Sequence, residues 1–478
     1  EAKKAIKHYN KYMEDLNTLT SVTYVRYSIE TTNKEYKKMM EIVDELSPVI
    51  SNYSTQYVEV LVNAPYRAEL EKELGSYVFK MYDNSLKVFK PEIMEDLVEE
   101  NKLNSQYDEV MGSAQIEFRG NIYNLSQMSK FKTDLDRKTR QEASEACDKW
   151  GNENAPKIEE IYDKMVKIRD QMAKKLGFKN FIELGYLNLG RTDYDSEKVA
   201  NYRKQIYESV VPLSNQLAKR QKARLGYKKM HFYDWNLSFL SGNPTPNGDE
   251  PVLVDHAQKM YNEMSKETGE FFTFMRENHL LDLTAKPGKQ PGGYMTFMPK
   301  YKAPFIFANF NGTSSDVDTL THEVGHAFQG YMTRNMKIGD YRSPGLEACE
   351  IHSMSMEFLT WPWMDLFFGD DVNKFKFSHL ESAVMFLPYG VAVDEFQHWV
   401  YENPNATPDE RDAKWLEIDK KYRPYMDWSE SPFYSKGRRW LLQSHIFGSP
   451  FYYIDYTLAQ VCAFQFLAES QKNREKTW

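Results

Sequence analysis

Residues 313–329 read TSSDVDTLTHEVGHAFQ, and the second half of this stretch contains the pattern HExxH. His322 and His326 are four residues apart, so on a helix both imidazoles leave the same face one turn apart. Two imidazoles at this spacing can hold one zinc ion. Glu323, next to them, could accept a proton from a water molecule that the metal activates. The stretch therefore predicts a helix with metal-dependent hydrolytic chemistry.

This helix has a predicted start and a predicted buried face. Ser314 or Ser315 can act as its N-cap, and aspartates follow in the first turn, where the helix dipole favours negative charge. Val324, Ala327 and Phe328 place apolar side chains around the motif, so we expect the helix to be buried. Because buried imidazoles and carboxylates need polar partners, a metal explains them better than a chance pair of surface histidines.

A catalytic zinc needs a third protein ligand and one open coordination position. Gln329 and Met332 stand where the longer metzincin motif would have glycine and a third histidine, which excludes that class. A glutamate from a following helix is the alternative.

A helix that begins near Ser343–Pro344 would carry the candidate third ligand. Glu347 and Glu350 are both open as that ligand, since residues three apart share a side of a helix. The spacing weakly favours Glu350, because Glu357 lies seven residues further on the same face and could orient a histidine ligand through a hydrogen bond.

Upstream of the motif, residues 290–311 have a different pattern. Two short extended runs, Met295–Met298 and Ala303–Phe310, are joined by a lysine-rich turn, which predicts a β-hairpin. The run Ala303–Phe310 could offer its edge to a peptide substrate through main-chain hydrogen bonds. Gly292 and Gly293 would let a neighbouring backbone approach closely. The alternative is a hairpin that only closes the site.

Outside this hairpin the spacing of apolar residues is typical of helices. In residues 195–225, for example, Ser196 is a candidate N-cap and Pro212 should kink the stretch or divide it into two helices. We therefore expect a mainly α fold with one small sheet next to the zinc-binding helix.

A loop rich in proline, glycine and asparagine, Leu237–Asp249, is a candidate domain boundary. It would separate an N-terminal helical region, residues 1–245, from a catalytic region, residues 246–478. The first residue is not methionine and the last segment stops within a helical pattern, so we expect the chain to be incomplete at both ends.

Composition excludes several classes of protein. The 61 Lys and Arg against 69 Asp and Glu give a net charge of −8. Binding to nucleic acid or to an anionic membrane needs clustered positive charge, so we expect neither partner. No apolar run approaches the roughly 18 residues that a membrane-spanning helix requires. The 3 cysteines are too few and too far apart for a disulfide framework, and no secretory signal is visible, which favours a cytoplasmic location.

The sequence around the motif resembles a known family. Pro304–Ile306, Asn309–Phe310 and Gly312–Thr313, followed by His322–His326, are similar to the zinc metallopeptidases of the thimet oligopeptidase type, and most similar to their oligoendopeptidase F branch. The resemblance continues through Glu350–Glu357 and through a tyrosine cluster near the C-terminus.

This resemblance implies roles for further residues. Glu350 would be the third ligand of one zinc ion per chain, and Glu357 would support a ligand from outside the coordination sphere. His445, with Tyr453 or Tyr456, would stabilise the developing oxyanion.

The resemblance also implies a substrate class. Family members enclose the zinc in a deep channel between two helical halves, so the substrates would be oligopeptides cleaved at internal bonds. The expected substrate contacts are Gly293, Ala308, Phe310 and Tyr452. The oligomeric state is left open.

Two alternatives to this function stay open. A zinc carboxypeptidase on a related helical scaffold would need a cationic group for the terminal carboxylate, and Arg438–Arg439 could supply it. A non-catalytic peptide-binding protein would keep only a structural metal. His352, His379 and His398 lie in predicted helices and are interpreted as structural.

Overall fold

The computed structural model describes residues 2–478, with side chains from residue 4 onward. Most of this part of the chain is helical, which confirms the mainly α fold. None of the described helices combines the length and apolar character that crossing a membrane requires.

The N-terminal half consists of helices and one short hairpin. Its elements are α1 (Ala2–Ile29), α2 (Lys34–Val62), α3 (Arg67–Leu74), α4 (Ser76–Val88), α5 (Met94–Gly112), β1 (Ile116–Phe118), β2 (Asn121–Tyr123), α6 (Leu125–Lys132), α7 (Arg137–Lys175), α8 (Phe181–Asn188), α9 (Ser196–Gln205) and α10 (Val211–Arg224).

The second half contains a small sheet and further helices. Its elements are α11 (Glu250–Met264), α12 (Lys266–Glu277), β3 (Leu281–Thr284), β4 (Tyr294–Met298), β5 (Ala303–Phe310), α13 (Ser315–Thr333), α14 (Leu346–Leu359), α15 (Met364–Phe368), α16 (Val372–Glu402), α17 (Pro408–Tyr422), α18 (Ser444–Gly448), α19 (Tyr453–Lys472) and α20 (Arg474–Thr477).

The predicted division of residues 195–225 is confirmed. A π-helical turn, Ile206–Val210, separates α9 from α10, and Pro212 occupies the first turn of α10, where a missing N–H costs nothing. The N-cap of α9 is Asp195 rather than Ser196, because the Asp195 carboxylate accepts the backbone N–H of Lys198 at 3.0 Å.

The three-stranded sheet has the order β3-β5-β4. β4 and β5 pair antiparallel, with Tyr294 opposite Phe307, which confirms the predicted hairpin. β3 pairs parallel to β5, with Leu281 opposite Ile306, and this strand was not predicted. β5 is thus the central strand, with β4 paired along residues 303–307 and β3 along residues 306–310, so it does not offer a continuous free edge to a peptide as predicted.

Two large hydrophobic cores hold these elements together. The first is formed by α5 to α10 with α16 to α19, so it joins helices from both halves of the sequence. The second is formed by α11, α12, α13, α15 and the three-stranded sheet. α13 contacts β4 and β5 of the sheet and also α14, and α14 in turn packs against α19.

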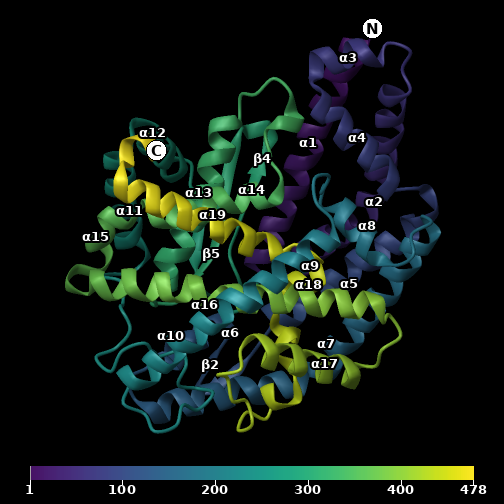
Figure 1. The fold of residues 1–478 in the computed structure, drawn as a ribbon. Coiled ribbons are helices and arrows are strands. Elements are labelled where there is room, and N and C mark those ends of the chain that lie inside the picture. The colour runs from purple at the N-terminus through teal and green to yellow at the C-terminus, as the bar shows by residue number, and fades with distance from the viewer. Residues whose placement is uncertain (1) are drawn as a thin grey trace.

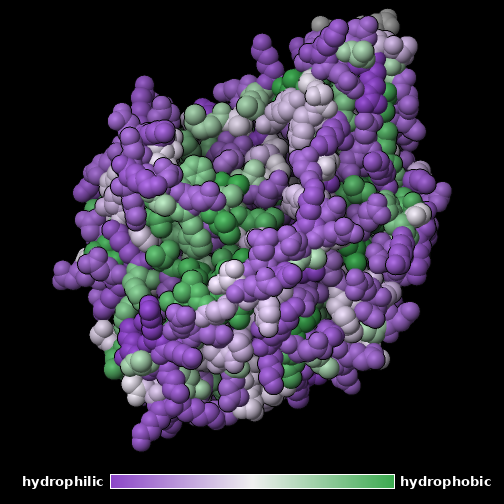
Figure 2. Space-filling model, viewed as in Figure 1, coloured by the Kyte–Doolittle hydropathy of each residue, from purple (hydrophilic) through white to green (hydrophobic). Residues whose placement is uncertain are grey.

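Figure 1 shows how this arrangement places the central helices. The N-terminal helices α1 to α4, in purple and blue, lie at the upper right, and α11, α12 and α15 lie at the left. β4, β5, α13 and α14 lie between these groups. The surface in the same view is mostly hydrophilic, with hydrophobic side chains gathered near the middle of the face (Figure 2).

Candidate metal centre

The start of α13 is fixed by an aspartate. Ser314 occupies the N-cap position but makes no side-chain cap bond, so the prediction of a serine cap is wrong. Instead the Asp316 carboxylate accepts the backbone N–H groups of Asn311 and Gly312, at 2.9 and 2.8 Å. These bonds tie the end of β5 to the first turn of α13 and so orient the helix that carries HExxH.

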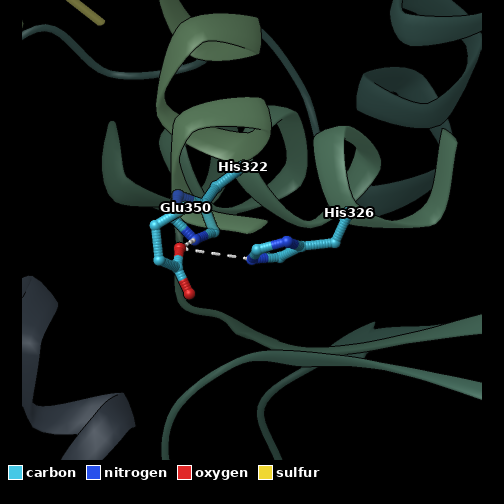
Figure 3. Close-up of side chains that lie close together, drawn as sticks. All are labelled: His322, His326 and Glu350. Atoms are coloured by element: carbon cyan, nitrogen blue, oxygen red, sulfur yellow. Dashed lines mark ion pairs between the residues drawn. The ribbon is translucent and has the colours of Figure 1, made fainter. Parts of the chain in front are cut away.

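Helix α13 presents both histidines of the motif to a single glutamate of α14. Nε2 of His322 lies 3.1 Å from Oε2 of Glu350, and Nε2 of His326 lies 3.4 Å from the same oxygen. Figure 3 shows the three side chains pointing toward one another. One ligand atom from each residue lies within 4.8 Å of the others, a grouping suited to a metal ion. Glu347, the competing candidate, is not part of this group.

Glu350 is buried, with a side chain only 1% exposed, and its oxygens have further partners. The hydroxyl of Ser353 donates to Oε2 at 2.8 Å, and the hydroxyl of Tyr452 donates to Oε1. Burial opposes the charged form, but His322 and His326 hold the pKa of the Glu350 carboxyl well below its ordinary value. The surroundings therefore stabilise the ionised carboxylate of Glu350 next to positive charge. α14 begins at Leu346, slightly later than predicted.

Glu323 lies beside this group, and one of its carboxylate oxygens has no hydrogen-bond partner. Its Oε2 is buried and makes no hydrogen bond within the described part of the chain. Burial raises the pKa of the Glu323 carboxyl above its ordinary value. Gly293 lies next to it, since a Cβ added there would fall 3.3 Å from Oε1 of Glu323. The backbone at Gly293 therefore lies directly against the Glu323 carboxylate.

Glu357 contacts the outer nitrogen of a candidate ligand, as the resemblance implied. Its Oε1 lies 2.7 Å from Nδ1 of His322, and its Oε2 lies 2.8 Å from Nε2 of His379. This bond leaves Nε2 of His322 directed at the metal position.

A histidine and a tyrosine meet on the side of α19. The side-chain amide of Gln443 donates to Nδ1 of His445 at 2.9 Å, so the His445 proton lies on Nε2, 3.2 Å from the Tyr456 hydroxyl oxygen. Burial lowers the pKa of His445 to about 4, which keeps the ring neutral at higher pH. Burial and Glu350 raise the pKa of Tyr456 well above its ordinary value. The Tyr456 hydroxyl therefore keeps a proton that it can donate.

Tyr453 and Tyr456 of the cluster face different surroundings. Tyr453 packs among aromatic rings, with centroids 5.8 Å from Phe386 and 5.9 Å from Tyr389. Tyr456 instead lies 6.4 Å from His322, centroid to centroid. The geometry thus brings Tyr456 to the metal ligands and places Tyr453 against the core.

Two of the expected substrate contacts have buried side chains. Ala308 has no exposed surface, and Phe310 is buried in the second core. Both belong to the central strand of the sheet, so their side chains are not available to a peptide, and a substrate contact through their main-chain atoms stays a prediction.

Arg438 and Arg439, the arginines considered for a carboxypeptidase, already contact other side chains. The Arg438 guanidinium lies 3.1 Å from Asp412 and 3.2 Å from Glu159. The Arg439 guanidinium lies over the ring of Tyr389, 5.3 Å from its centroid. Arg438 is therefore not free to bind a terminal carboxylate.

Comparison with known protein families agrees with this site. The sequence model of the family described as peptidase family M3 matches residues 130–477. The sequence model described as the peptidase M3 N-terminal domain matches residues 1–89. The chain belongs to peptidase family M3. This membership confirms the predicted family resemblance.

Solved structures of peptidases are similar over the whole chain. A structure of PZ peptidase A with an inhibitor is 49% identical, with a TM-score of 0.99, and the match covers 100% of this chain and 85% of that one. A structure described as an oligoendopeptidase F from Bacillus anthracis is 49% identical, with a TM-score of 0.92, covering 99% and 83%.

A structure of oligoendopeptidase-F from Enterococcus faecium is 15% identical, with a TM-score of 0.60, and the match covers 95% of this chain and 79% of that one. At this identity the likeness concerns the fold alone. A search of curated proteins gives no match.

Three residues around the candidate metal centre of this M3 peptidase are not predicted from the sequence. His379 was interpreted as structural, and Trp361, which donates to it, was not considered. Both lie far along the chain from HExxH, so no local spacing could reveal them. Asp318 could have been found, because it precedes His322 by one helical turn, and its Oδ1 is 4.0 Å from Nε2 of His379.

Proposed function

We propose that this M3 peptidase is a zinc-dependent endopeptidase that hydrolyses internal bonds of oligopeptides. The observation that carries the proposal is the convergence of His322, His326 and Glu350 beside Glu323, a carboxylate with a free oxygen. Two imidazoles and one carboxylate, with one position left open, are the donor set of a catalytic zinc.

The residues fit one zinc ion per chain. The His322 and His326 Nε2 atoms face the same oxygen of Glu350, so all three can turn toward a single ion. When bound, zinc supplies Lewis acidity, which polarises a carbonyl group and makes a water molecule a better nucleophile near neutral pH. Cobalt or manganese could occupy the same ligands, and zinc is favoured by their type.

Glu323 is proposed as the general base. Its free oxygen accepts a proton from the attacking water and then returns that proton to the leaving amine. The raised pKa of its carboxyl suits a group that must both take up and release a proton. Because Glu323 is fixed on α13 next to His322, this transfer needs no large movement of the side chain.

Tyr456 and His445 are proposed to stabilise the oxyanion of the tetrahedral intermediate. His445 donates its Nε2 proton to the Tyr456 oxygen. The Tyr456 O–H, which lies beside the Tyr452 hydroxyl, is proposed to turn to the substrate oxyanion. Tyr453 is the second candidate, and its packing against aromatic rings makes it the weaker one.

Oligopeptides are the proposed substrates. Gly293 lies against Glu323, and Tyr452 lies against Glu350, so both are proposed to border the bound peptide. A deep channel between two helical halves would exclude folded proteins. The identity of 49% to PZ peptidase A supports this substrate class. The three cysteines are free, which supports a reducing compartment such as the cytoplasm.

Mass spectrometry of the products tests this proposal against its alternatives. A peptide of about ten residues, blocked at both ends, should be cut at internal bonds. A carboxypeptidase would cut only the peptide with a free C-terminus. A binding protein would retain both peptides intact. Either of these outcomes, obtained with folded and zinc-loaded protein, would overturn the proposed endopeptidase.

A further inference from the structure

Three hydrogen bonds in a row join Trp361 to the candidate ligand His322. The indole Nε1–H of Trp361 donates to Nδ1 of His379 at 2.9 Å. Nε2 of His379 lies 2.8 Å from Oε2 of Glu357, and Oε1 of Glu357 lies 2.7 Å from Nδ1 of His322. This hydrogen-bond chain links the turn after α14 to α16, returns to α14 and ends on α13.

The indole fixes the direction of every bond in this chain. A tryptophan N–H can only donate, so Nδ1 of His379 accepts and carries no proton. An imidazolium at His379 would set a second N–H against the indole N–H. The single proton of His379 is therefore on Nε2, from which it is donated to Glu357. With Oε2 occupied in this way, Glu357 keeps Oε1 to accept the Nδ1–H of His322.

The surroundings hold the chain in this arrangement. His379 is 8% exposed, and its ring stacks on Phe375, with centroids 5.6 Å apart and planes 10° from parallel. The side chain of Glu357 is 14% exposed. Asp318 is the other carboxylate facing His379, but its Oδ1 lies 4.0 Å from Nε2. With little water in reach, protein partners decide which nitrogen carries each proton.

We propose that Trp361 and His379 are positioning residues, which hold Glu357 as the acceptor for Nδ1–H of His322 and so commit Nε2 of His322 to the metal. The inference rests on the proposed function and extends it, since these two residues lie outside the group of metal ligands. Hydrogen bonds to the outer nitrogen of a ligand fix the ring orientation and raise its basicity.

The first test measures how fast zinc-loaded protein releases zinc to an excess of a chromogenic chelator. His379→Leu removes the donor to Glu357, and release should become about 10 to 100 times faster. His379→Gln keeps an N–H donor but loses the ring, so it should recover most of the wild-type rate. Release from His379→Leu at the wild-type rate would overturn the proposal. Equally fast release from both variants would also overturn it, because ring packing alone would then explain the effect.

Trp361 and Trp363 provide a matched pair of variants in one short turn. Nε1 of Trp363 donates to Oε2 of Glu263 at 2.8 Å, away from the metal centre. Trp361→Phe should release zinc about 3 to 10 times faster than wild type, as expected for one lost hydrogen bond. Trp363→Phe should release zinc at the wild-type rate. Equal effects of the two substitutions would contradict the role of the Trp361 donor.

Nitrogen-15 NMR of the histidines in metal-free protein tests the hydrogen bond from Trp361 to His379 without zinc and without turnover. At neutral pH the wild-type protein should carry the His379 proton on Nε2, and Trp361→Phe should show a second population with a proton on Nδ1. Wild-type protein that binds zinc but carries this proton on Nδ1 would defeat the positioning role alone. Failure to bind zinc, with the proton on Nε2, would defeat the proposed metal site.

Discussion

Gly325 of α13 lies directly against the backbone of Ser353 in α14. A Cβ added to Gly325 would fall 2.6 Å from the Cα of Ser353 and 2.9 Å from the carbonyl oxygen of His352. Real Cβ atoms essentially never come so close to other atoms. The glycine inside HEVGH therefore lets the two helices approach, and this approach brings Glu350 within reach of both histidines.

Gly325→Ala should force α13 and α14 apart. The contacts are with backbone, which cannot rotate away, so we expect the free energy of unfolding to fall by about 1 to 3 kcal/mol. Zinc affinity should fall as well, because Glu350 moves with α14. Chemical denaturation and competition with a chelator measure the two effects. Gly339→Ala lies in the loop between these helices, where an added Cβ would meet open space. This variant should change neither the free energy of unfolding nor the zinc affinity.

Glu323→Gln should reduce turnover to a trace and leave the metal in place. Loss of a general base typically lowers kcat by about 10² to 10⁴. Zinc content, measured by atomic emission, should stay near one per chain, since Glu323 is not part of the ligand group. Glu347→Gln is the matched control and should retain both activity and zinc. Wild-type turnover in Glu323→Gln would exclude it as the base, and simultaneous loss of zinc would contradict its place outside the ligand group.

Tyr456→Phe should lower kcat with little change in KM. Removing one donor to a developing oxyanion typically costs about 10² to 10³ in kcat. Tyr453→Phe removes the same hydroxyl from a neighbouring residue that packs among aromatic rings, so its kcat should stay close to that of wild type. A larger loss from Tyr453→Phe than from Tyr456→Phe would reverse the assignment of the oxyanion donor.

Asp108→Asn should change how stability depends on pH. Asp108 is 6% exposed in α5, and burial together with Asp44 raises the pKa of its carboxyl from 3.8 to about 7. The folded state therefore binds the proton more tightly than the unfolded state. This contribution to stability is fully present below about pH 4 and is lost as the pH rises through 7.

The asparagine variant cannot ionise, so it does not lose this stability as the pH rises. The free energy of unfolding of the variant minus that of wild type should therefore increase by about 1 to 3 kcal/mol from pH 5 to pH 8. Urea denaturation at each pH measures this difference. Glu277→Gln, which removes an exposed carboxyl of α12, is the control for the substitution itself. A difference from wild type that stays constant with pH for Asp108→Asn would show that the Asp108 carboxyl is ionised across this range.

Local patterns in the sequence predicted the features that depend on neighbouring residues. The HExxH spacing predicted one helical face with two imidazoles, and the turn between two apolar runs predicted the hairpin of β4 and β5. Pro212 predicted the division between α9 and α10, because its effect on the backbone is local.

Features that depend on long-range packing could not be predicted in this way. β3 has four residues, too few for a clear period, and it pairs with a strand that begins about twenty residues later. Without that strand, the burial of Ala308 and Phe310 could not be foreseen. His379 reaches Glu357 from another helix, and only the folded structure shows it.

The most direct test of the proposed function follows the turnover of an internally quenched peptide of about ten residues, blocked at both ends, before chelation, after it and after zinc is restored. We predict internal cleavage that disappears with the chelator and returns when zinc is added to about one ion per chain. Cleavage that continues in protein shown to be free of metal would contradict the account, as would folded, zinc-loaded protein that leaves the peptide intact.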